Sequence, residues 1–233
     1  MYKKTAILQS NYIPWKGYFD LINSVDEFIL FDEVQYTKND WRNRNLIKTG
    51  QGLQWLSIPV KQTSLHTQRV CDTQVANAVW RKKHWQSLVT NYSKAPCFKN
   101  FSEPFKALYL GQTTSELSQI NYQFITAINN ILNIKTKLSW SSDYTLAAGK
   151  TARLVKLCQD SSAQEYISGP SAKNYIEADL FAQANIKLTW MDYAGYPEYP
   201  QLHPPFQHTV SILDLIFNVG ADAPAYMHSF HSA

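Results

Sequence analysis

The pattern of hydrophobic and polar positions predicts short buried strands that alternate with helices. Apolar runs with the length of strands occur at residues 5–9, 27–31, 53–59, 137–140, 165–168 and 186–191. Helical spacing and helix start or stop signals predict helices at residues 17–24, 79–92, 98–110, 113–133, 150–159, 175–183 and 211–218. Because strands that alternate with helices favour parallel pairing, we expect an α/β, Rossmann-like layered fold with a mainly parallel sheet.

The first strand, the helix after it and the second strand form a predicted βαβ unit over residues 5–31. In such units, ligands bind outside the carboxyl ends of the strands. Gln9 follows the first strand, and Asp32 and Gln35 follow the second. We therefore expect these polar side chains at the ligand-binding edge of the sheet, with Gln9 and Tyr12, in the turn after the first strand, as candidate ligand-binding residues.

Three consecutive predicted helices form a helical insertion at about residues 79–133. The third is expected to begin at a capping box, because Glu116 follows Thr113 by three positions. The apolar stripe of this helix then indicates a face that packs in the core. We expect a single domain over residues 1–233, with 79–133 as a candidate helical subdomain.

The charge is mild but unevenly distributed. The formal net charge is +4, which is too small to indicate nucleic-acid binding. However, residues 80–99 contain five Lys or Arg residues and no acid, and residues 37–48 contain four basic residues against Asp40. Two such runs favour an anionic small molecule, such as a nucleotide sugar, as the ligand.

The cysteines and the apolar runs bear on location and cofactors. The three cysteines are scattered and form no CxxC pair, so no metal site is predicted and the cofactor is unknown. The N-terminal residues do not resemble a signal peptide, and no apolar run approaches the roughly 18 residues of a membrane span. These features predict a cytoplasmic protein without a transmembrane segment, whose oligomeric state is unknown.

The densest polar stretch runs from residue 32 to residue 48. Its guanidinium and ammonium groups suit phosphate or carboxylate oxygens, and its indole and amides suit a polar ligand. The alternative is a surface hairpin held by its own salt bridges. The predicted anion- and ligand-binding residues of this stretch are Gln35, Trp41, Arg42, Asn43, Arg44 and Lys48.

Two further segments carry candidate chemistry. On the helix at 79–92, His84 shares a face with Trp80 and Ser87, and its ordinary pKa suits a general base. The alternative is a structural histidine. The strand-to-helix turn at 168–173 offers backbone N–H groups and a charge to an anion, or else is a plain turn capped by Ser171. Its candidate binding residues are Gly169, Ser171 and Lys173.

The long proline-rich loop at 192–208 and the last helix supply the remaining candidates. His208 is a candidate acid or base, and Asp214 could orient a histidine or form a salt bridge. The role of His203 is left open. Ser, His and Asp all occur here, but the nucleophile elbow GxSxG is missing, which disfavours a serine hydrolase.

Four sequence blocks together resemble the WbqC-like family of bacterial proteins: QSNYIPWKGYFDLI, DEVQYTKNDWRNRNLIK, SGPSAKNYI and GYPEYPQLHPPFQHTVSILDLIFNVG. The resemblance implies an association with surface-polysaccharide genes, especially those for lipopolysaccharide O-antigen, and a candidate transferase activity on amino sugars. No catalytic assignment comes with it. Residues that fit the family pattern include Gln9, Tyr12, Asp32, Gln35, Trp41, Arg42, Asn43, Arg44, Lys48, His84, Gly169, His208 and Asp214.

The resemblance implies a transferase in surface-glycan assembly that moves an amino-acid or acyl group to an amino sugar, and the polar segments supply candidate residues for it. Arg42, Arg44 and Lys48 would bind the anionic donor, with help from Gly169 and Lys173. His84 or His208 would act as general base, oriented by Asp32 or Asp214. The alternative is a glycan- or nucleotide-binding partner protein without catalytic activity.

Overall fold

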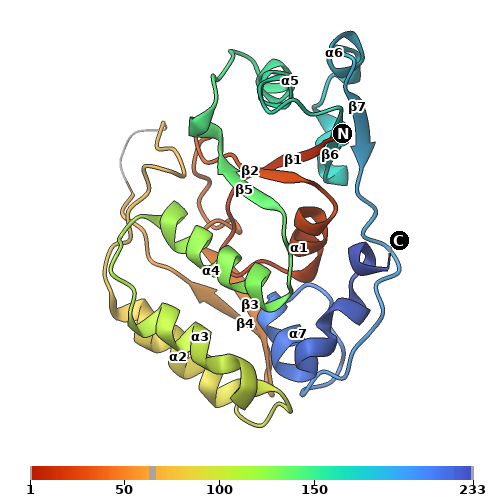
Figure 1. Cartoon of the computed structure of the whole chain (residues 1–233). Coiled ribbons are helices and arrows are strands. Elements are labelled where there is room, and N and C mark those ends of the chain that lie inside the picture. Colours follow the sequence, from red (N-terminus) through yellow and green to blue (C-terminus); the bar gives the residue numbers. More distant parts are fainter. Residues whose placement is uncertain (1, 63–66, 232–233) are drawn as a thin grey trace.

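A five-stranded, wholly parallel sheet forms the centre of the molecule (Figure 1). The computed structural model describes residues 2–62 and 67–231. The sheet order is β5-β2-β1-β6-β7. The strands are β1 (Lys4–Leu8), β2 (Glu27–Leu30), β5 (Lys137–Trp140), β6 (Glu165–Ser168) and β7 (Lys187–Trp190). The predicted α/β layered fold is therefore confirmed.

The strand order has a reversal point beside β1. From β1 the chain builds outward through β2 to β5, and then returns to the other side of β1 with β6 and β7. In open parallel sheets, a crevice forms outside the carboxyl ends of the two strands at this reversal. The fold thus places a crevice between the segment after β1 and the segment after β6.

The central strands β1, β2 and β6 are largely buried, as expected for parallel strands covered on both faces, whereas the edge strands β5 and β7 are partly exposed. Because successive side chains of a strand point to opposite faces of the sheet, Ala6 and Ile7 of β1 pack in two different apolar clusters. The cluster with Ile7 includes side chains of α5 (Lys150–Asp160) and α6 (Ala178–Gln183). The cluster with Ala6 includes side chains of α1 (Lys16–Asn23) and α7 (Ile212–Val219).

The segment between β2 and β5 forms the predicted helical insertion, preceded by a hairpin. The antiparallel hairpin consists of β3 (Arg44–Thr49) and β4 (Gly52–Ser57). The helices are α2 (Val79–Tyr92), α3 (Phe98–Leu110) and α4 (Leu117–Ile131). In Figure 1, α2 and α3 lie at the end of the molecule away from α5 and α6. The strand predicted at 53–59 therefore pairs with β3 and not with the central sheet.

The start of α4 differs from the prediction, and the proposed capping box is wrong. The helix begins at Leu117, with Glu116 as an N-cap whose side chain forms no capping bond. The preceding residues are instead extended, because Ser115 accepts a hydrogen bond from Val75 N and Thr73 accepts one from Leu117 N. Pairing with a distant segment has overridden the local capping signal.

Short 3-10 helices complete the fold: η1 (Ser141–Asp143), η2 (Pro170–Asn174), η3 (Gly220–Tyr226) and η4 (His228–Phe230). The segment η4 is attached to α1. The buried Asp20 carboxylate accepts hydrogen bonds from the backbone N–H groups of His228 (2.8 Å) and Ser229 (2.9 Å). It also accepts one from the Tyr196 hydroxyl (2.5 Å), which fixes the start of the long loop to the same helix.

Candidate functional site

A large cleft lies at the reversal point of the sheet, with a cavity volume of about 960 Å³. We call it the switch-point cleft. Gln9 and Asn11, which follow β1, line one side, and Ser168, Gly169 and Ser171, at the end of β6 and in the turn after it, line another. The sequence predicted a site at this edge of the sheet, and the largest of the described pockets lies there.

Basic side chains from two parts of the chain line the switch-point cleft. They are Arg42, Lys150 and Arg153, and no aspartate or glutamate is among the described residues of the lining. Arg42 donates to Gln9 Oε1 (3.0 Å) and to Asn11 Oδ1, and lies 3.5 Å from the carboxylate of Asp40. The cleft therefore presents mainly positive charge to a ligand.

The two basic residues of α5 that line the cleft, Lys150 and Arg153, have unused donors. Arg153 donates through Nε to the Ala147 carbonyl (3.0 Å) and lies over the Phe31 ring, 5.8 Å from its centroid. Lys150 has no hydrogen-bond or ion-pair partner in the described part of the chain. Gly149 caps α5 with a positive φ of 88° and no side-chain hydrogen bond. The helix thus leaves first-turn N–H groups and their partial positive charge at the cleft.

Aromatic rings form much of the remaining wall. The rings that line the cleft belong to Trp15, Phe31, Trp41, Tyr166, Tyr175 and Tyr193. Trp15 packs edge-on against Tyr193, with ring centroids 5.2 Å apart, while Trp41 is 41% exposed. Burial raises the pKa of Tyr193 to about 12, so its hydroxyl remains a donor at neutral pH. Flat apolar faces with polar tips suit a ligand that contains rings.

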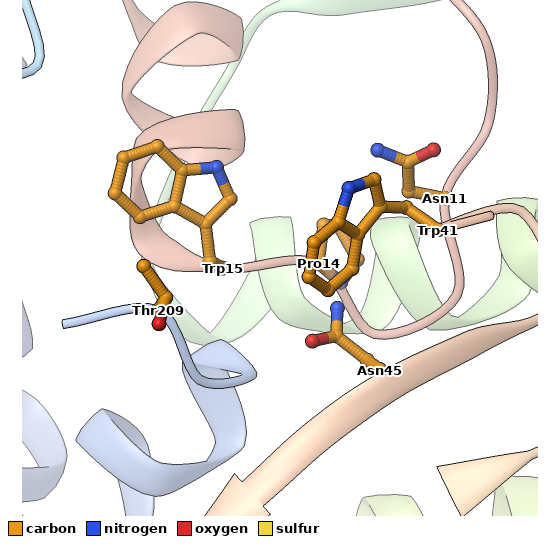
Figure 2. A pocket seen from close by; sticks show the side chains of 6 residues that line it. All are labelled: Asn11, Pro14, Trp15, Trp41, Asn45 and Thr209. Atoms are coloured by element: carbon orange, nitrogen blue, oxygen red, sulfur yellow. The ribbon is translucent and has the colours of Figure 1, made fainter. Parts of the chain in front are cut away.

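A second, smaller pocket of about 180 Å³ adjoins the cleft and shares Asn11, Trp15 and Trp41 with it (Figure 2). We call it the tryptophan pocket. Its other lining residues are Pro14, Asn45 and Thr209.

Asn45 shapes the turn that carries Pro14 and Trp15. Its amide donates to the carbonyls of Tyr12 (3.1 Å) and Ile13 (3.0 Å), and Ile13 has a φ of 38°, in the left-handed region. A β-branched residue adopts such a φ only when its surroundings impose it. The hairpin residue Asn45 is thus a positioning residue for the first turn of the chain.

Five of the predicted site residues line the switch-point cleft: Gln9, Trp41, Arg42, Gly169 and Ser171. They come from three segments that are distant in sequence, and the structure brings them together. Their participation in ligand binding stays a prediction.

Asp32 and the predicted binding residue Tyr12 are buried, and neither is among the residues that line the cleft. The Asp32 carboxylate accepts hydrogen bonds from Ser10 N (2.8 Å), Ser10 Oγ (2.7 Å) and Ser118 Oγ (2.5 Å). Because these donors occupy both of its oxygens, Asp32 holds the segment after β1 against α4. The predicted catalytic role of Asp32 gains no support from this position.

His84 lies in an aromatic cluster and is only 6% exposed. Its Nδ1 is 2.9 Å from the Tyr12 hydroxyl, which is 2.6 Å from the Tyr109 hydroxyl. Burial lowers the pKa of His84 to about 4, against a hydrogen bond with the Ser57 backbone that raises it. The imidazole is therefore neutral at pH 7, but it lies in the core and is not among the residues that line the cleft.

Asp214 and His208 flank the long loop. Asp214, 1% exposed, accepts hydrogen bonds from the hydroxyls of Tyr92 (2.8 Å) and Tyr199 (2.7 Å) and from the Gln201 amide (3.0 Å). His208 packs against Phe206, and its Nδ1 is buried without a hydrogen-bond partner. Burial lowers the pKa of His208, and the charge of Lys16 lowers it further.

The remaining predicted binding residues have other contacts. Asn43 donates to the Ile58 carbonyl (2.8 Å), and Lys48 donates to the Pro205 carbonyl (2.5 Å). The Arg44 guanidinium lies 4.0 Å from the centroid of the Trp55 ring. Gln35 is exposed, and its backbone pairs with that of Arg69 in an isolated antiparallel β-bridge. Lys173 is also exposed and lies 5.8 Å from the centroid of the Trp190 ring. None of these predicted residues is among the described residues that line either pocket.

The sequence reasoning missed Asn11, Trp15, Lys150, Arg153 and Tyr193, which line the cleft. The position of Lys150 could have been predicted from the sequence, because the segment between β5 and α5 must lie at the carboxyl edge of the parallel sheet. Arg153 follows one helical turn later and so shares a face with Lys150.

The fold and the cleft define a class of protein: an open, doubly wound α/β protein with a cationic, aromatic-walled cleft at its switch point. The model of the WbqC-like protein family matches residues 9–226, and the chain belongs to this family. It is 51% identical over 225 residues to a Mycobacterium tuberculosis protein named "Uncharacterized protein Rv1507c", a match that covers 97% of each chain. No solved structure matches.

Two further findings concern the described residues. Within residues 2–62 and 67–231, no helix has both the length and the apolar character needed to cross a bilayer. In the same part of the chain, no group of three or more histidine, cysteine, aspartate or glutamate residues is arranged to bind a metal ion.

Proposed function

We propose that the switch-point cleft binds a nucleotide-linked sugar or a similar anionic small molecule. One observation carries the proposal: Arg42, Lys150 and Arg153 line a cleft to which the described residues contribute no carboxylate. Guanidinium and ammonium groups are the usual partners of phosphate oxygens, and the uncapped first turn of α5 adds N–H donors. The aromatic walls suit the rings of such a ligand.

The reaction that fits this ligand is group transfer in the cytoplasm during bacterial surface-glycan assembly, with an amino-acid or acyl group passing to an amino sugar. The family's association with surface-polysaccharide genes supports this setting. In this transfer the acceptor amine or hydroxyl attacks the acyl carbon of the donor, the bond from that carbon to the donor's carrier group breaks, and a base takes the acceptor's proton. Of the two predicted histidines, His208 is the better candidate, because it precedes Thr209 of the tryptophan pocket and its lowered pKa favours the neutral form.

A second candidate function is ligand binding without turnover, as a partner of another enzyme. The observation that favours it is the position of His84, Asp32 and Asp214. These three of the four predicted catalytic groups are buried and form hydrogen bonds with the protein itself.

The binding proposal is tested by isothermal titration of UDP and UDP-N-acetylglucosamine into the wild-type chain and into Arg153→Ala. We expect the variant to bind at least about tenfold more weakly, because a charge-assisted hydrogen bond contributes about 1.5–3 kcal/mol. Lys83→Ala, an exposed lysine on α2, is the matched control and should bind as the wild type does. Equal affinities for all three proteins would refute the assignment of the cleft.

Turnover separates the two candidate functions. An aminoacyl or acyl donor and an amino-sugar acceptor are incubated with the wild type and with His208→Ala. Loss of product with UDP-N-acetylglucosamine binding retained supports the transferase. Binding by the wild type with no product from any donor supports the binding protein.

A further inference from the structure

The switch-point cleft and the tryptophan pocket differ in charge. The cleft is lined by Arg42, Lys150 and Arg153. Among the residues that the structure describes, those that line the tryptophan pocket are all uncharged: Asn11, Pro14, Trp15, Trp41, Asn45 and Thr209. An anionic group is therefore favoured in the cleft, whereas the tryptophan pocket favours an uncharged one.

The two cavities adjoin, so that one ligand can occupy both. Asn11, Trp15 and Trp41 belong to both linings. Figure 2 shows the indole of Trp41 beside Asn11 and Asn45, with the indole of Trp15 nearer to Thr209. Arg42 directly follows Trp41 and forms a hydrogen bond with Asn11, which places a cation of the cleft beside the shared residues.

The size and chemistry of the tryptophan pocket suit a single ring. Its volume is about 180 Å³, and an apolar cavity of about 150 Å³ suffices to bind benzene. The amide groups of Asn45 already bind backbone atoms of Tyr12, Ile13 and Leu46, so Asn45 forms part of the wall. The hydroxyl of Thr209 and the Asn11 amide nitrogen are left to bind polar substituents of the ring.

From these observations we infer that the tryptophan pocket is a subsite for an uncharged ring, the base or the sugar, of the ligand whose phosphates bind in the switch-point cleft. The inference rests on the proposed function and assigns the two parts of a nucleotide sugar to two cavities. Stacking of the ring on the indole of Trp41 supplies the affinity.

We expect replacement of the Trp41 side chain to leave the fold intact. Its side chain is 41% exposed and packs against Trp55, which is 42% exposed and is not in the described lining of either pocket. The one backbone bond that Trp41 makes to the turn, from Tyr12 N to its carbonyl (3.0 Å), survives replacement of the side chain. Trp55→Ala is therefore a matched control.

The test measures the affinity of the full chain for inorganic pyrophosphate, UDP and UDP-N-acetylglucosamine. We expect Trp41→Ala to leave pyrophosphate binding unchanged and to weaken UDP-N-acetylglucosamine binding about tenfold, whereas Trp55→Ala changes neither. If UDP binding weakens in parallel, the base occupies the tryptophan pocket. If UDP binding is unaffected, the sugar occupies it.

The inference is overturned if Trp41→Ala leaves UDP-N-acetylglucosamine binding unchanged, or if it weakens pyrophosphate binding by the same factor. Failure of the proposed function looks different. In that case the wild type binds none of the three probes, or Arg153→Ala binds all of them as tightly as the wild type, and the subsite assignment falls with it.

Discussion

His84 shows how a side chain's surroundings decide its chemistry. Trp80, His84, Leu88 and Tyr92 are spaced by four positions and so share one face of α2, and all four are buried. Because burial lowers the pKa of His84 to about 4, the unfolded chain binds a proton here between about pH 4 and its ordinary value of about 6.5, while the folded chain does not. The free energy of unfolding should therefore rise with pH across this window, by about 3 kcal/mol from this residue.

The measurement is urea unfolding of the wild type, His84→Gln and His231→Gln at pH 4.5 and pH 7. For each protein, the free energy of unfolding at pH 4.5 is subtracted from that at pH 7. A loss of stability that is the same at both pH values therefore cancels. We expect the pH dependence to shrink in His84→Gln and to persist in His231→Gln, whose histidine is exposed near the C-terminus. An unchanged pH dependence in His84→Gln would mean that the folded histidine titrates normally.

At the scale of single residues, positions at the cleft could be predicted from the sequence, whereas hydrogen-bond partners could not. Gln9 and Gly169 could be placed at the cleft because a residue that directly follows a parallel strand must lie at its carboxyl edge. Asp32 and Asp214 could not be interpreted, because their partners lie far away in sequence. Asp32 binds Ser118, 86 positions on, and Asp214 binds Tyr92, 122 positions back.

Among the elements, the long loop at 192–208 is held in place by buried polar groups. Tyr199 and Gln201 in this loop both donate to Asp214 in α7, and Tyr92 of α2 donates to the same carboxylate. Asp214→Ala would leave the buried hydroxyls of Tyr92 and Tyr199 without this acceptor, whereas the Gln201 amide keeps its hydrogen bond to the Gln207 carbonyl. We expect the free energy of unfolding to fall by about 2–4 kcal/mol, as measured in urea at pH 7.

Asp222→Ala is the control for this prediction, since Asp222 is exposed in η3, a short distance along the chain from Asp214. We expect it to change stability by less than about 0.5 kcal/mol. Similar effects of the two substitutions would show that the hydrogen bonds of Asp214 do not stabilise the loop.

The sequence predicted the positions of helices and strands well where apolar residues recur at a regular helical or strand spacing. The predicted bounds of α2, α3, β5 and β6 agree with the structure. The start of α4 did not follow, because the residues before it pair with a segment some 40 positions earlier, where Gln74 forms a bridge with Glu116. A local capping signal cannot report such a pairing.

At the scale of the whole molecule, the helical insertion shares its core with the sheet. Tyr12, from the turn after β1, contacts His84 of α2 and Phe124 of α4. Phe217 of α7 packs against Phe98 and Phe105 of α3. We propose that residues 79–133 do not fold as a separate unit and that the chain is a single cooperative domain.

Leu88→Ala tests this cooperativity, because Leu88 is fully buried in α2 and its truncation should destabilise the fold by about 2–5 kcal/mol. In one cooperative domain, hydrogen exchange of the β1 amides and of the α3 amides should lose the same protection free energy. Val89→Ala, at the neighbouring position that is 36% exposed, should leave both nearly unchanged. A loss confined to α2, α3 and α4 would instead define an independent helical subdomain, and would separate the cleft's stability from that of the insertion.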